Sequence, residues 1–248
     1  YSLGENINNF KIGQKVIAMP GHGAFAEYCI SPAKKLIPLN YNIDYDTASI
    51  LPMVYGTTAH ALIQRGKLKN GETLLVHGAA GGVGLAAVEI GKAMGANVIA
   101  TASTDEKCQV AKEHGADHTI NYSNGEFKET VKEMTDGKGA DVIYDPVGGD
   151  IFDQSLRCIA WEGRLLVIGF TSGRIPSAPA NLALLKSCDI VGVFWGAFVE
   201  RTPNVNLENF QKIYKWIEQG YIKPRISMKV TLENVLDAMN SIAERKII

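Results

Sequence analysis

A glycine-rich run at residues 78–84 has the residue types and spacing that a phosphate-binding turn requires. It directly follows the apolar run 73–77 and precedes a helical pattern of small residues at 85–94. Such a turn, between a buried strand and the start of a helix, is typical of dinucleotide-binding sites. The first glycine allows a tight turn, the second lets the backbone approach a pyrophosphate, and the third lets helix and strand pack closely. Free N–H groups at the helix start would bind the phosphates. The alternative to a dinucleotide site is a glycine-rich turn that holds no ligand.

The end of the second predicted strand indicates which nicotinamide dinucleotide is preferred. An acidic residue there binds the ribose 2′-hydroxyl of NAD and repels a 2′-phosphate. This chain instead has the small, neutral Ser103, and Lys107 follows one helical turn later as a partner for phosphate. Asp105 and Glu106 are candidate ribose acids, but a Ser103–Glu106 capping box and the helix dipole also explain acids at a helix start. We therefore expect NADPH, with a solvated helix position as the alternative role of Lys107.

Composition and charge exclude several other classes of protein. The 248 residues are 46% hydrophobic and 21% charged, which is ordinary for a soluble globular protein. A formal net charge of −1 gives no electrostatic reason to expect nucleic acid or an anionic membrane as a partner. The sequence has no apolar stretch as long as a membrane span and no signal-peptide pattern at its start. We expect a cytoplasmic protein with neither kind of partner.

Cysteine and histidine spacing gives no sign of a metal site. The four cysteines lie far apart, at Cys29, Cys108, Cys158 and Cys188. The sequence has no C-x-x-C pair, which argues against a zinc lobe or a redox dithiol and fits reduced, mostly buried thiols. His114 and His118 are four residues apart, but Gly115 breaks the predicted helix between them. We expect no bound metal.

From residue 73 onward, strand and helix patterns alternate. The predicted strands cover residues 73–77, 97–102, 117–120, 140–144, 164–168 and 189–194. The predicted helices after the glycine-rich one cover residues 104–114, 125–135, 149–160, 206–220 and 231–245. In helix 206–220 the apolar face is predicted to hold Leu207, Phe210, Ile213, Tyr214 and Ile217. Continuous apolar strands separated by helices predict an α/β fold with a doubly wound parallel sheet.

The first 65 residues have a different pattern. Short apolar runs at 15–19, 24–30 and 35–39 predict strands of a small β-rich unit. Asp46 is predicted to cap a helix that Pro52 interrupts, and a second helical stretch is predicted from residue 56 to 65.

Three segments carry a resemblance to a known family. Residues 76–85, 145–150 and 163–169 read VHGAAGGVGL, DPVGGD and GRLLVIG, and together they resemble the zinc-independent NADPH:quinone oxidoreductases (zeta-crystallin-like) of the medium-chain dehydrogenase/reductase superfamily. Residues 179–186 and 192–196 are similar to the bacterial branch of that family. Residues 3–6, 10–16 and 23–28 resemble the latter half of its GroES-like catalytic domain.

The resemblance implies a domain organisation. A Rossmann sheet would bind NADPH in residues 66–200, and residues 1–65 would be part of the GroES-like β-rich domain. Residues 201–248 would end the Rossmann domain and return to the catalytic domain. The family's first segment, which supplies polar active-site residues, would precede Tyr1, and its last strand would follow Ile248. The chain is therefore expected to be a piece of a longer polypeptide, and its catalytic side chains stay unassigned.

The resemblance also implies contacts with each part of NADPH. The pyrophosphate would contact Gly81, Gly82 and Val83. The 2′-phosphate and adenine end would contact Ser103, Lys107 and Tyr122. The ribose would lie against Val147 and Gly148. The nicotinamide would lie near Thr58, Ile168, Gly169 and Phe170, with Phe194 and Trp195 closing the cleft. The alternatives are packing roles for Tyr122 and Phe194 and a simple turn at Gly148 and Gly149.

The activity that the resemblance implies is hydride transfer from NADPH to a quinone, by a homodimer or homotetramer. The open edge strand 189–194 would pair the subunits. One alternative is reduction of the C=C bond of α,β-unsaturated carbonyls such as enals. A zinc-dependent alcohol dehydrogenase would show a four-cysteine lobe soon after residues 13–16, where this chain has none. An alternative from outside the enzymes is a non-catalytic NADPH sensor or a crystallin-like protein.

Overall fold

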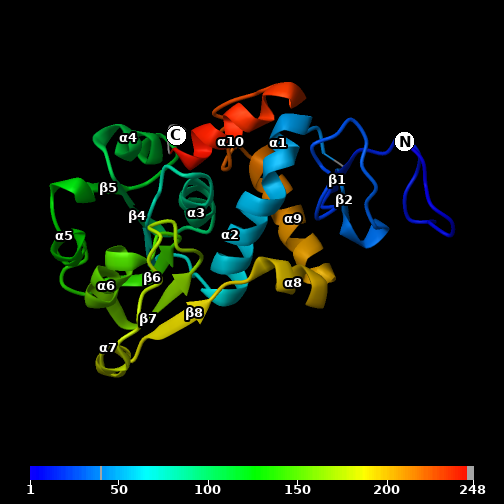
Figure 1. Ribbon diagram of the computed structural model, residues 1–248. Helices are drawn as coiled ribbons and strands as arrows, with labels where there is room; N and C mark the ends of the chain where they lie inside the picture. Colours follow the sequence, from blue (N-terminus) through cyan, green and yellow to red (C-terminus); the bar gives the residue numbers. More distant parts are fainter. Residues whose placement is uncertain (40, 245–248) are drawn as a thin grey trace. The chain divides into compact units, whose positions relative to one another are not determined.

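The computed structural model describes residues 1–39 and 41–244 of the chain (Figure 1). These residues form two compact units. The larger unit runs from Met53 to Lys223, and the smaller one combines Tyr1–Pro52 with the segment that begins at Pro224. The domain organisation with boundaries after residues 65 and 200 stays a prediction.

Within the described residues, the larger unit contains one parallel sheet of six strands. In spatial order, these are β5 (His118–Asn121), β4 (Asn97–Ala102), β3 (Thr73–Val76), β6 (Ala140–Asp145), β7 (Ile159–Val167) and β8 (Asp189–Gly192). The central strands are almost wholly buried, because helices cover both faces of the sheet. This confirms the predicted doubly wound fold. The strand order reverses between β3 and β6, and folds of this kind bind ligands at the carboxyl ends of the strands beside such a reversal.

Helices flank the sheet in Figure 1. They include α3 (Gly82–Ala93), α4 (Asp105–Glu113), the 3-10 turn η4 (Tyr122–Asn124), α5 (Phe127–Met134), α6 (Gly149–Cys158) and α7 (Ala180–Lys186). The larger unit also contains α8 (Trp195–Arg201) and α9 (Pro203–Glu218). The buried core between the sheet and these helices includes Leu75, Ile143 and Leu165 from strands, packed with Phe127 and Phe152.

Two predicted strands differ from the structure by two residues or more at one end. β7 begins at Ile159, five residues before the predicted start, because Ile159 pairs with Ala140 ahead of an irregularity in the register. β8 ends at Gly192 rather than at residue 194.

The helical segment before β3 differs from the prediction at two points. Helix α1 (Tyr45–Ile50) is capped by Asp44, whose carboxylate accepts the Thr47 N–H at 2.9 Å, rather than by Asp46. Helical backbone then continues through Pro52 as π-helical η2 (Leu51–Gly56), α2 (Thr57–Ala59) and π-helical η3 (His60–Arg65). The wider π-type turns accommodate a proline ring that would clash with a carbonyl in an ordinary helix.

The smaller unit contains an antiparallel pair of strands, β1 (Val16–Ala18) and β2 (Leu36–Pro38). The 3-10 turn η1 (Ala33–Lys35) directly precedes β2. The strand predicted at 24–30 is absent from the described structure, where Phe25 and Tyr28 are exposed and no strand pairs with this run. The predicted helix 231–245 consists of the 3-10 turn η5 (Leu232–Asn234) and α10 (Val235–Ala243). Its predicted last residue lies outside the described residues.

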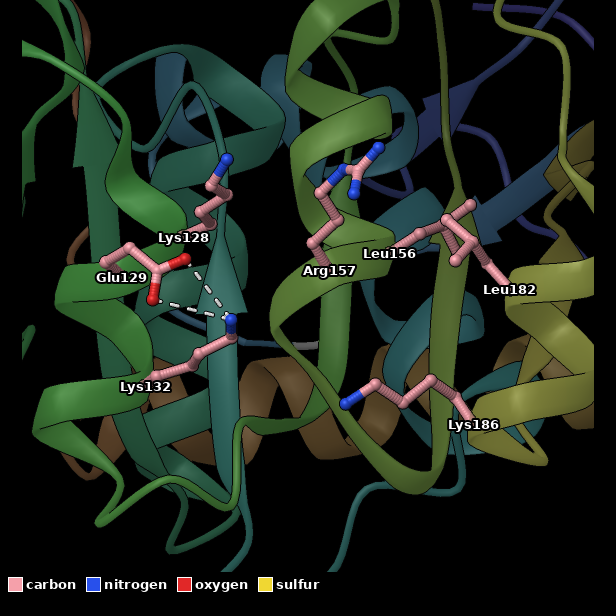
Figure 2. A pocket seen from close by; sticks show the side chains of 7 residues that line it. All are labelled: Lys128, Glu129, Lys132, Leu156, Arg157, Leu182 and Lys186. Carbon is pink, nitrogen blue, oxygen red and sulfur yellow. Dashed lines mark hydrogen bonds and ion pairs between the residues drawn. The ribbon is translucent and has the colours of Figure 1, made fainter.

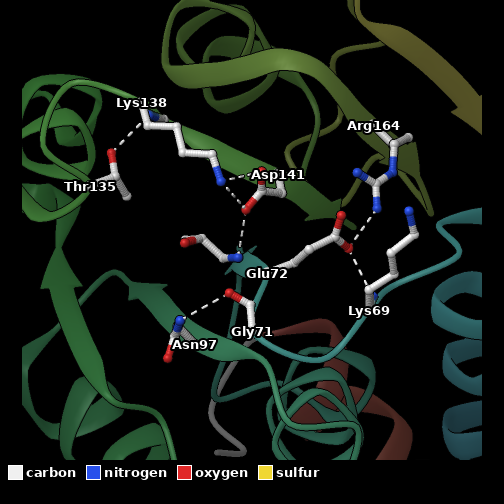
Figure 3. A network of polar contacts seen from close by, with 10 residues as sticks. Lys69, Gly71, Glu72, Asn97, Thr135, Lys138, Asp141 and Arg164 are labelled. Atoms are coloured by element: carbon white, nitrogen blue, oxygen red, sulfur yellow. Dashed lines mark hydrogen bonds and ion pairs between the residues drawn. The ribbon is translucent and has the colours of Figure 1, made fainter.

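Ion pairs and hydrogen bonds fix the amino ends of the central strands (Figure 3). The Asp141 carboxylate accepts the Thr73 N–H at 2.8 Å and the Lys138 ammonium at 2.8 Å, which joins β6 to β3. The Glu72 carboxylate accepts the Arg164 guanidinium at 2.8 Å, which joins the start of β3 to β7. These contacts set the register of three strands and leave their opposite, carboxyl ends for other groups.

Candidate functional site

The glycine-rich turn after β3 has the backbone geometry that a phosphate cradle needs. Gly78 has a φ of +57°, which non-glycine residues rarely adopt. A Cβ on Gly84 would lie 2.2 Å from the Gly78 carbonyl oxygen, so helix α3 starts directly against the turn. These two glycines have the tight-turn and close-packing roles that the sequence predicts.

The start of α3 presents unpaired backbone N–H groups. Its N-cap is Gly81, and no side chain in the described part of the chain caps it. The first hydrogen bond of the helix runs from the Leu85 N–H to the Gly81 carbonyl at 2.8 Å, so the N–H groups of Gly82 and Val83 precede it. Gly81 and Gly82 are exposed. Free N–H groups and the positive end of a helix dipole together form an anion site.

The loops after β3, β6 and β7 lie side by side. A Cβ on Gly78 would lie 3.4 Å from Val147, and one on Gly148 would lie 3.0 Å from Phe170. The Ile168 N–H also donates to the Asp145 carbonyl at 3.0 Å. The structure thus brings together the residues predicted for the pyrophosphate, the ribose and the nicotinamide: Gly81, Gly82, Val83, Val147, Gly148, Ile168, Gly169 and Phe170.

Asp145 organises the loop after β6, a role that the sequence prediction missed. Its buried carboxylate accepts the N–H groups of Val147 at 2.8 Å and Gly148 at 2.9 Å. Burial raises the pKa of the Asp145 carboxyl, and the two hydrogen bonds oppose that rise. The Asp-Pro pair was the available signal, because aspartate side chains bond their own backbone two residues on in turns.

The ends of β4 and β5 bring Ser103, Lys107 and Tyr122 to one region. The Ser123 hydroxyl donates to the Ser103 carbonyl, which ties the two loops together. Tyr122 is half-buried and packs against the core, which is the packing role that the sequence offered as the alternative for its ring. The Lys107 side chain is half-buried and has no ion pair within the described part of the chain.

The predicted Ser103–Glu106 capping box is wrong. Thr104 is the N-cap of α4, and its hydroxyl accepts the Lys107 N–H at 3.2 Å. The extended backbone of Thr104, with a φ of −146°, places its hydroxyl over the helix start. Asp105, a candidate ribose acid, accepts the Asn121 side-chain amide at 2.7 Å.

Thr58 lies beside the first turn of α3 and is fully buried. Its hydroxyl donates to the Val54 carbonyl at 2.8 Å and lies 3.4 Å from the Val83 carbonyl. The Tyr144 hydroxyl, 3.0 Å away, then acts as donor to the Thr58 oxygen. Burial raises the pKa of Tyr144, so this hydroxyl keeps its proton. These bonds fix the η2–α2 segment against the start of α3.

Phe194 and Trp195 point to different environments despite being neighbours. The Phe194 side chain is 77% exposed, whereas Trp195 is buried. The Trp195 indole N–H donates to Asn206 at 3.1 Å, and a Cβ on Gly56 would lie 2.8 Å from its ring. Trp195 therefore packs α8 against η2 and α9.

Helix α9 buries asparagines where the sequence pattern favoured apolar residues. Asn206 and Asn209 are buried, and Leu207, predicted on the buried face, is 38% exposed. Asn209 exchanges two hydrogen bonds with the Gln64 side chain, at 2.9 and 3.0 Å. Phe210, Ile213 and Tyr214 of the predicted apolar face are buried, so the hydrophobic periodicity located most of that face correctly. It missed the two asparagines, whose partners lie on other elements.

A buried carboxylate on α3 is a second group that the sequence prediction missed. Glu89 accepts hydrogen bonds from the Tyr55 hydroxyl and His114 Nδ1, both at 2.7 Å, and from the Lys223 N–H at 3.1 Å. Its signal was a single acid within the apolar, small-residue pattern at 85–94. His114 thus contacts the Glu89 carboxylate, and the described residues hold no group of three or more potential metal-ligating side chains.

His77, at the end of β3, is fully buried and held by two hydroxyls. Its Nδ1 lies 2.8 Å from Thr101 and its Nε2 lies 2.8 Å from Ser155. Because Ser155 donates its own proton to the Ile151 carbonyl, the hydrogen bonds assign the proton of the imidazole to Nε2. Burial lowers the pKa of His77 to about 3, so the ring is neutral and structural.

Comparison with known proteins gives one matching family and several similar chains. The family model described as zinc-binding dehydrogenase matches residues 82–212. Quinone oxidoreductase-like protein 2 of Bos taurus is 39% identical over 98% of this chain and 70% of its own length.

None of the helices in the described residues has both the length and the apolar content that a membrane crossing requires.

Three solved structures are similar to the whole of the described chain. A quinone oxidoreductase of Pseudomonas syringae pv. Tomato DC3000 has a TM-score of 0.91 at 29% identity, covering 98% of this chain and 75% of that one. A mycobacterial protein complexed with NADPH has a TM-score of 0.90 at 29% identity, covering 100% and 77%. A 2-haloacrylate reductase has a TM-score of 0.87 at 31% identity, covering 97% and 76%.

Proposed function

The chain belongs to the zinc-independent quinone oxidoreductases of the medium-chain dehydrogenase/reductase superfamily, and from this membership we propose that it transfers a hydride from NADPH to a quinone. It is a nicotinamide-dependent oxidoreductase that acts on a small molecule. The observation that carries the proposal is the uncapped start of α3, set against Gly78 where the strand order reverses.

The residues of this chain fit a dinucleotide at that edge of the sheet. The N–H groups of Gly82 and Val83 would bind the pyrophosphate, next to the exposed backbone of Gly81. A side chain at Gly78 or Gly84 would disrupt the turn itself, so both positions hold glycine. Val147 and Gly148 would lie along the ribose.

Three observations support NADPH over NADH. Because Thr104 caps α4, the Ser103 hydroxyl has no capping role and would be available to a 2′-phosphate. The carboxylate of Asp105 is bonded to Asn121 rather than free for a ribose hydroxyl. The ammonium of Lys107, which has no ion pair among the described residues, would supply the charge. Tyr122 would border the adenine.

When bound, NADPH supplies the hydride, and the protein has to align an electron-poor carbon with it and exclude water. Ile168, Gly169 and Phe170 would border the nicotinamide, with Thr58 holding the helix beside it. The exposed ring of Phe194 would cover the substrate. Trp195 would hold the start of α8, which follows Phe194, in place through its packing on Gly56.

The test is oxidation of NADPH by the full-length protein in the presence of a 1,2- or 1,4-quinone. We expect turnover that depends on both substrates and is faster with NADPH than with NADH. Tight binding of NADPH without turnover of quinones or enals would refute the reductase function and favour the sensor or crystallin-like alternative.

Reduction of the C=C bond of an α,β-unsaturated carbonyl is the second candidate. The similarity to a 2-haloacrylate reductase supports it, because the substrate in that name is an alkene conjugated to a carboxylate. Comparing kcat/KM for a quinone, an enal and a 2-haloacrylate decides between the two. A quinone value below that of either alkene would replace the first candidate by the second.

We also propose that the protein is cytoplasmic and forms a homodimer, or a tetramer of such dimers, through β8. This strand is the edge of the sheet in the described structure, and Ile190 on it is 36% exposed. Light scattering on Ile190→Lys should show a monomer, whereas Ile175→Lys, at another exposed isoleucine, should leave the oligomer intact. An Ile190→Lys oligomer of unchanged mass would rule out this interface.

A further inference from the structure

A pocket with a volume of about 310 Å³ lies between the outer surfaces of α5, α6 and α7 (Figure 2). This volume is at the lower end of the range for small-molecule sites. Four basic side chains line the pocket, Lys128 and Lys132 from α5, Arg157 from α6 and Lys186 from α7, against one acid, Glu129. Leu156 and Leu182 complete the lining.

The pocket is distinct from the cofactor site proposed above. Helix α6 begins at Gly149, beside the loop predicted to hold the ribose, and the pocket is lined from its last turn. A helix of ten residues is about 15 Å long, so the two sites lie at opposite ends of α6.

Two of the four cations have their charge balanced and two do not. Lys132 pairs with Glu129 at 3.2 Å, and Lys128 pairs with Glu126 at 2.6 Å. Arg157 and Lys186 have no ion pair with any residue that the structure describes. The pocket therefore has a net charge of about two positive units that no protein group offsets.

The cations lie in two sets. In Figure 2, Arg157 and Lys128 reach one end of the pocket and Lys132 and Lys186 reach the other, while Leu156 and Leu182 lie to one side of both sets. Electrostatics support the second set, because the charges of Lys132 and Lys186 both oppose the rise that burial causes in the pKa of Cys158.

Stabilisation of helix ends explains only part of this arrangement. Lys132, Arg157 and Lys186 each lie in the last turn of a helix, where a cation interacts favourably with the helix dipole. That role needs one cation at each helix end. It accounts neither for Lys128, near the start of α5, nor for a hollow around which all four cations meet.

We propose that this pocket binds a small molecule with two anionic groups joined by a short carbon chain. One anionic group would bind Arg157, whose guanidinium suits the two oxygens of a carboxylate or phosphate, and the other would bind Lys186. The carbon chain would lie along Leu182, which is half-buried at the pocket wall. The proposal needs no covalent step and does not depend on the hydride acceptor.

Glutarate and butyrate are suitable probes because they differ mainly in the second carboxylate. Chemical shifts of backbone amides, followed during titration at low ionic strength, give both affinities and locate the binding residues. We expect glutarate to shift amides near residues 157 and 186 and to bind about tenfold more tightly than butyrate, as one additional charge-assisted contact would give.

Arg157→Gln and Lys186→Gln should each remove this preference for glutarate. The matched controls Lys212→Gln and Lys215→Gln, at exposed lysines of α9, should keep it. All four variants should bind NADPH like the parent chain, so a failure of the proposed function would be seen separately. Equal affinity for the two acids, an unchanged preference in Arg157→Gln and Lys186→Gln, or shifts confined to residues 78–84 would overturn the proposal.

Discussion

The Tyr55 hydroxyl donates a hydrogen bond of 2.7 Å to the buried carboxylate of Glu89, 34 residues further along the chain. Burial and the neighbouring carboxylate both raise the pKa of Tyr55, so this bond keeps its proton on the phenol. Together with the bonds from His114 and the Lys223 N–H, it joins three other segments of the larger unit to the Glu89 side chain. The cluster is a stability determinant, because a buried charge that loses its partners is strongly destabilising.

Glu89→Gln should therefore lower the free energy of unfolding by about 3 kcal/mol. The amide has one acceptor oxygen in place of two, and its NH2 group would face one of the donors that now bond to the carboxylate. Tyr55→Phe should cost less, about 1–2 kcal/mol, because it removes a single hydrogen bond. Urea denaturation measures both values. Glu106→Gln, at an exposed glutamate of α4, serves as control, and an equal effect in this variant would contradict the assignment.

Gly84→Ala should disrupt the turn after β3. The new Cβ would lie 2.2 Å from the Gly78 carbonyl oxygen, which the backbone can relieve only by moving α3 away from the turn. We expect a loss of about 2–3 kcal/mol in stability, as for other overpacked positions, and NADPH binding weakened more than tenfold. Gly82→Ala is the matched control for stability, because its Cβ would make an ordinary 3.5 Å contact with Val54. A Gly84→Ala protein as stable as the parent would show that this contact is not a constraint.

Lys107→Ala should weaken NADPH binding about tenfold and leave NADH binding unchanged. The expected loss is that of one charge-assisted hydrogen bond to the 2′-phosphate. Isothermal titration with both cofactors measures it, with Lys212→Ala on α9 as the control for general electrostatics. If the affinities for NADPH and NADH fell equally, the role of Lys107 at the 2′-phosphate would be wrong.

The stability of the protein should depend on pH through His77. Its pKa is about 3 in the folded protein, against 6.5 for a free imidazole side chain. Between these values the unfolded chain binds the extra proton, so the free energy of unfolding should fall as the pH drops from 6.5 towards 3. Through this group, the free energy of unfolding should change by about 1.4 kcal/mol per pH unit between the two pKa values. The full stabilisation is present above a pH of about 6.5.

Denaturation of His77→Gln over this pH range checks the assignment. The glutamine does not titrate, so its curve should be flatter than that of the parent chain, although the variant is less stable at neutral pH. His22→Gln, at an exposed histidine, should keep the slope of the parent. An unchanged slope in His77→Gln would assign the pH dependence to other groups.

The sheet and the glycine-rich turn after β3 could be predicted from sequence because their signals are local. Buried parallel strands are continuous apolar runs, and the turn at 78–84 needs glycines at fixed positions whatever surrounds it. The cap of α4 was harder to predict, since Ser103 and Thr104 are adjacent hydroxyl residues. The choice between them depends on the backbone angles at the end of β4.

The features that escaped prediction depend on partners far away in the sequence. Asn209 is buried because Gln64 satisfies it, and Glu89 is buried because Tyr55, His114 and Lys223 do. Hydrophobic periodicity assigns such polar residues to the surface. The strand predicted at 24–30 failed for the opposite reason, since its apolar pattern is present but no strand of the described structure pairs with it.

The chain crosses between its two compact units twice, after Pro52 and after Lys223. During translation, residues 1–52 emerge before the parallel sheet, but their partners in the same unit, such as Lys229 for Asp46, emerge after it. All six strands of the parallel sheet leave the ribosome in the interval. The sheet is thus able to fold while residues 1–52 still lack the later segment of their own unit, and we expect this nascent segment to have the greatest need of a chaperone.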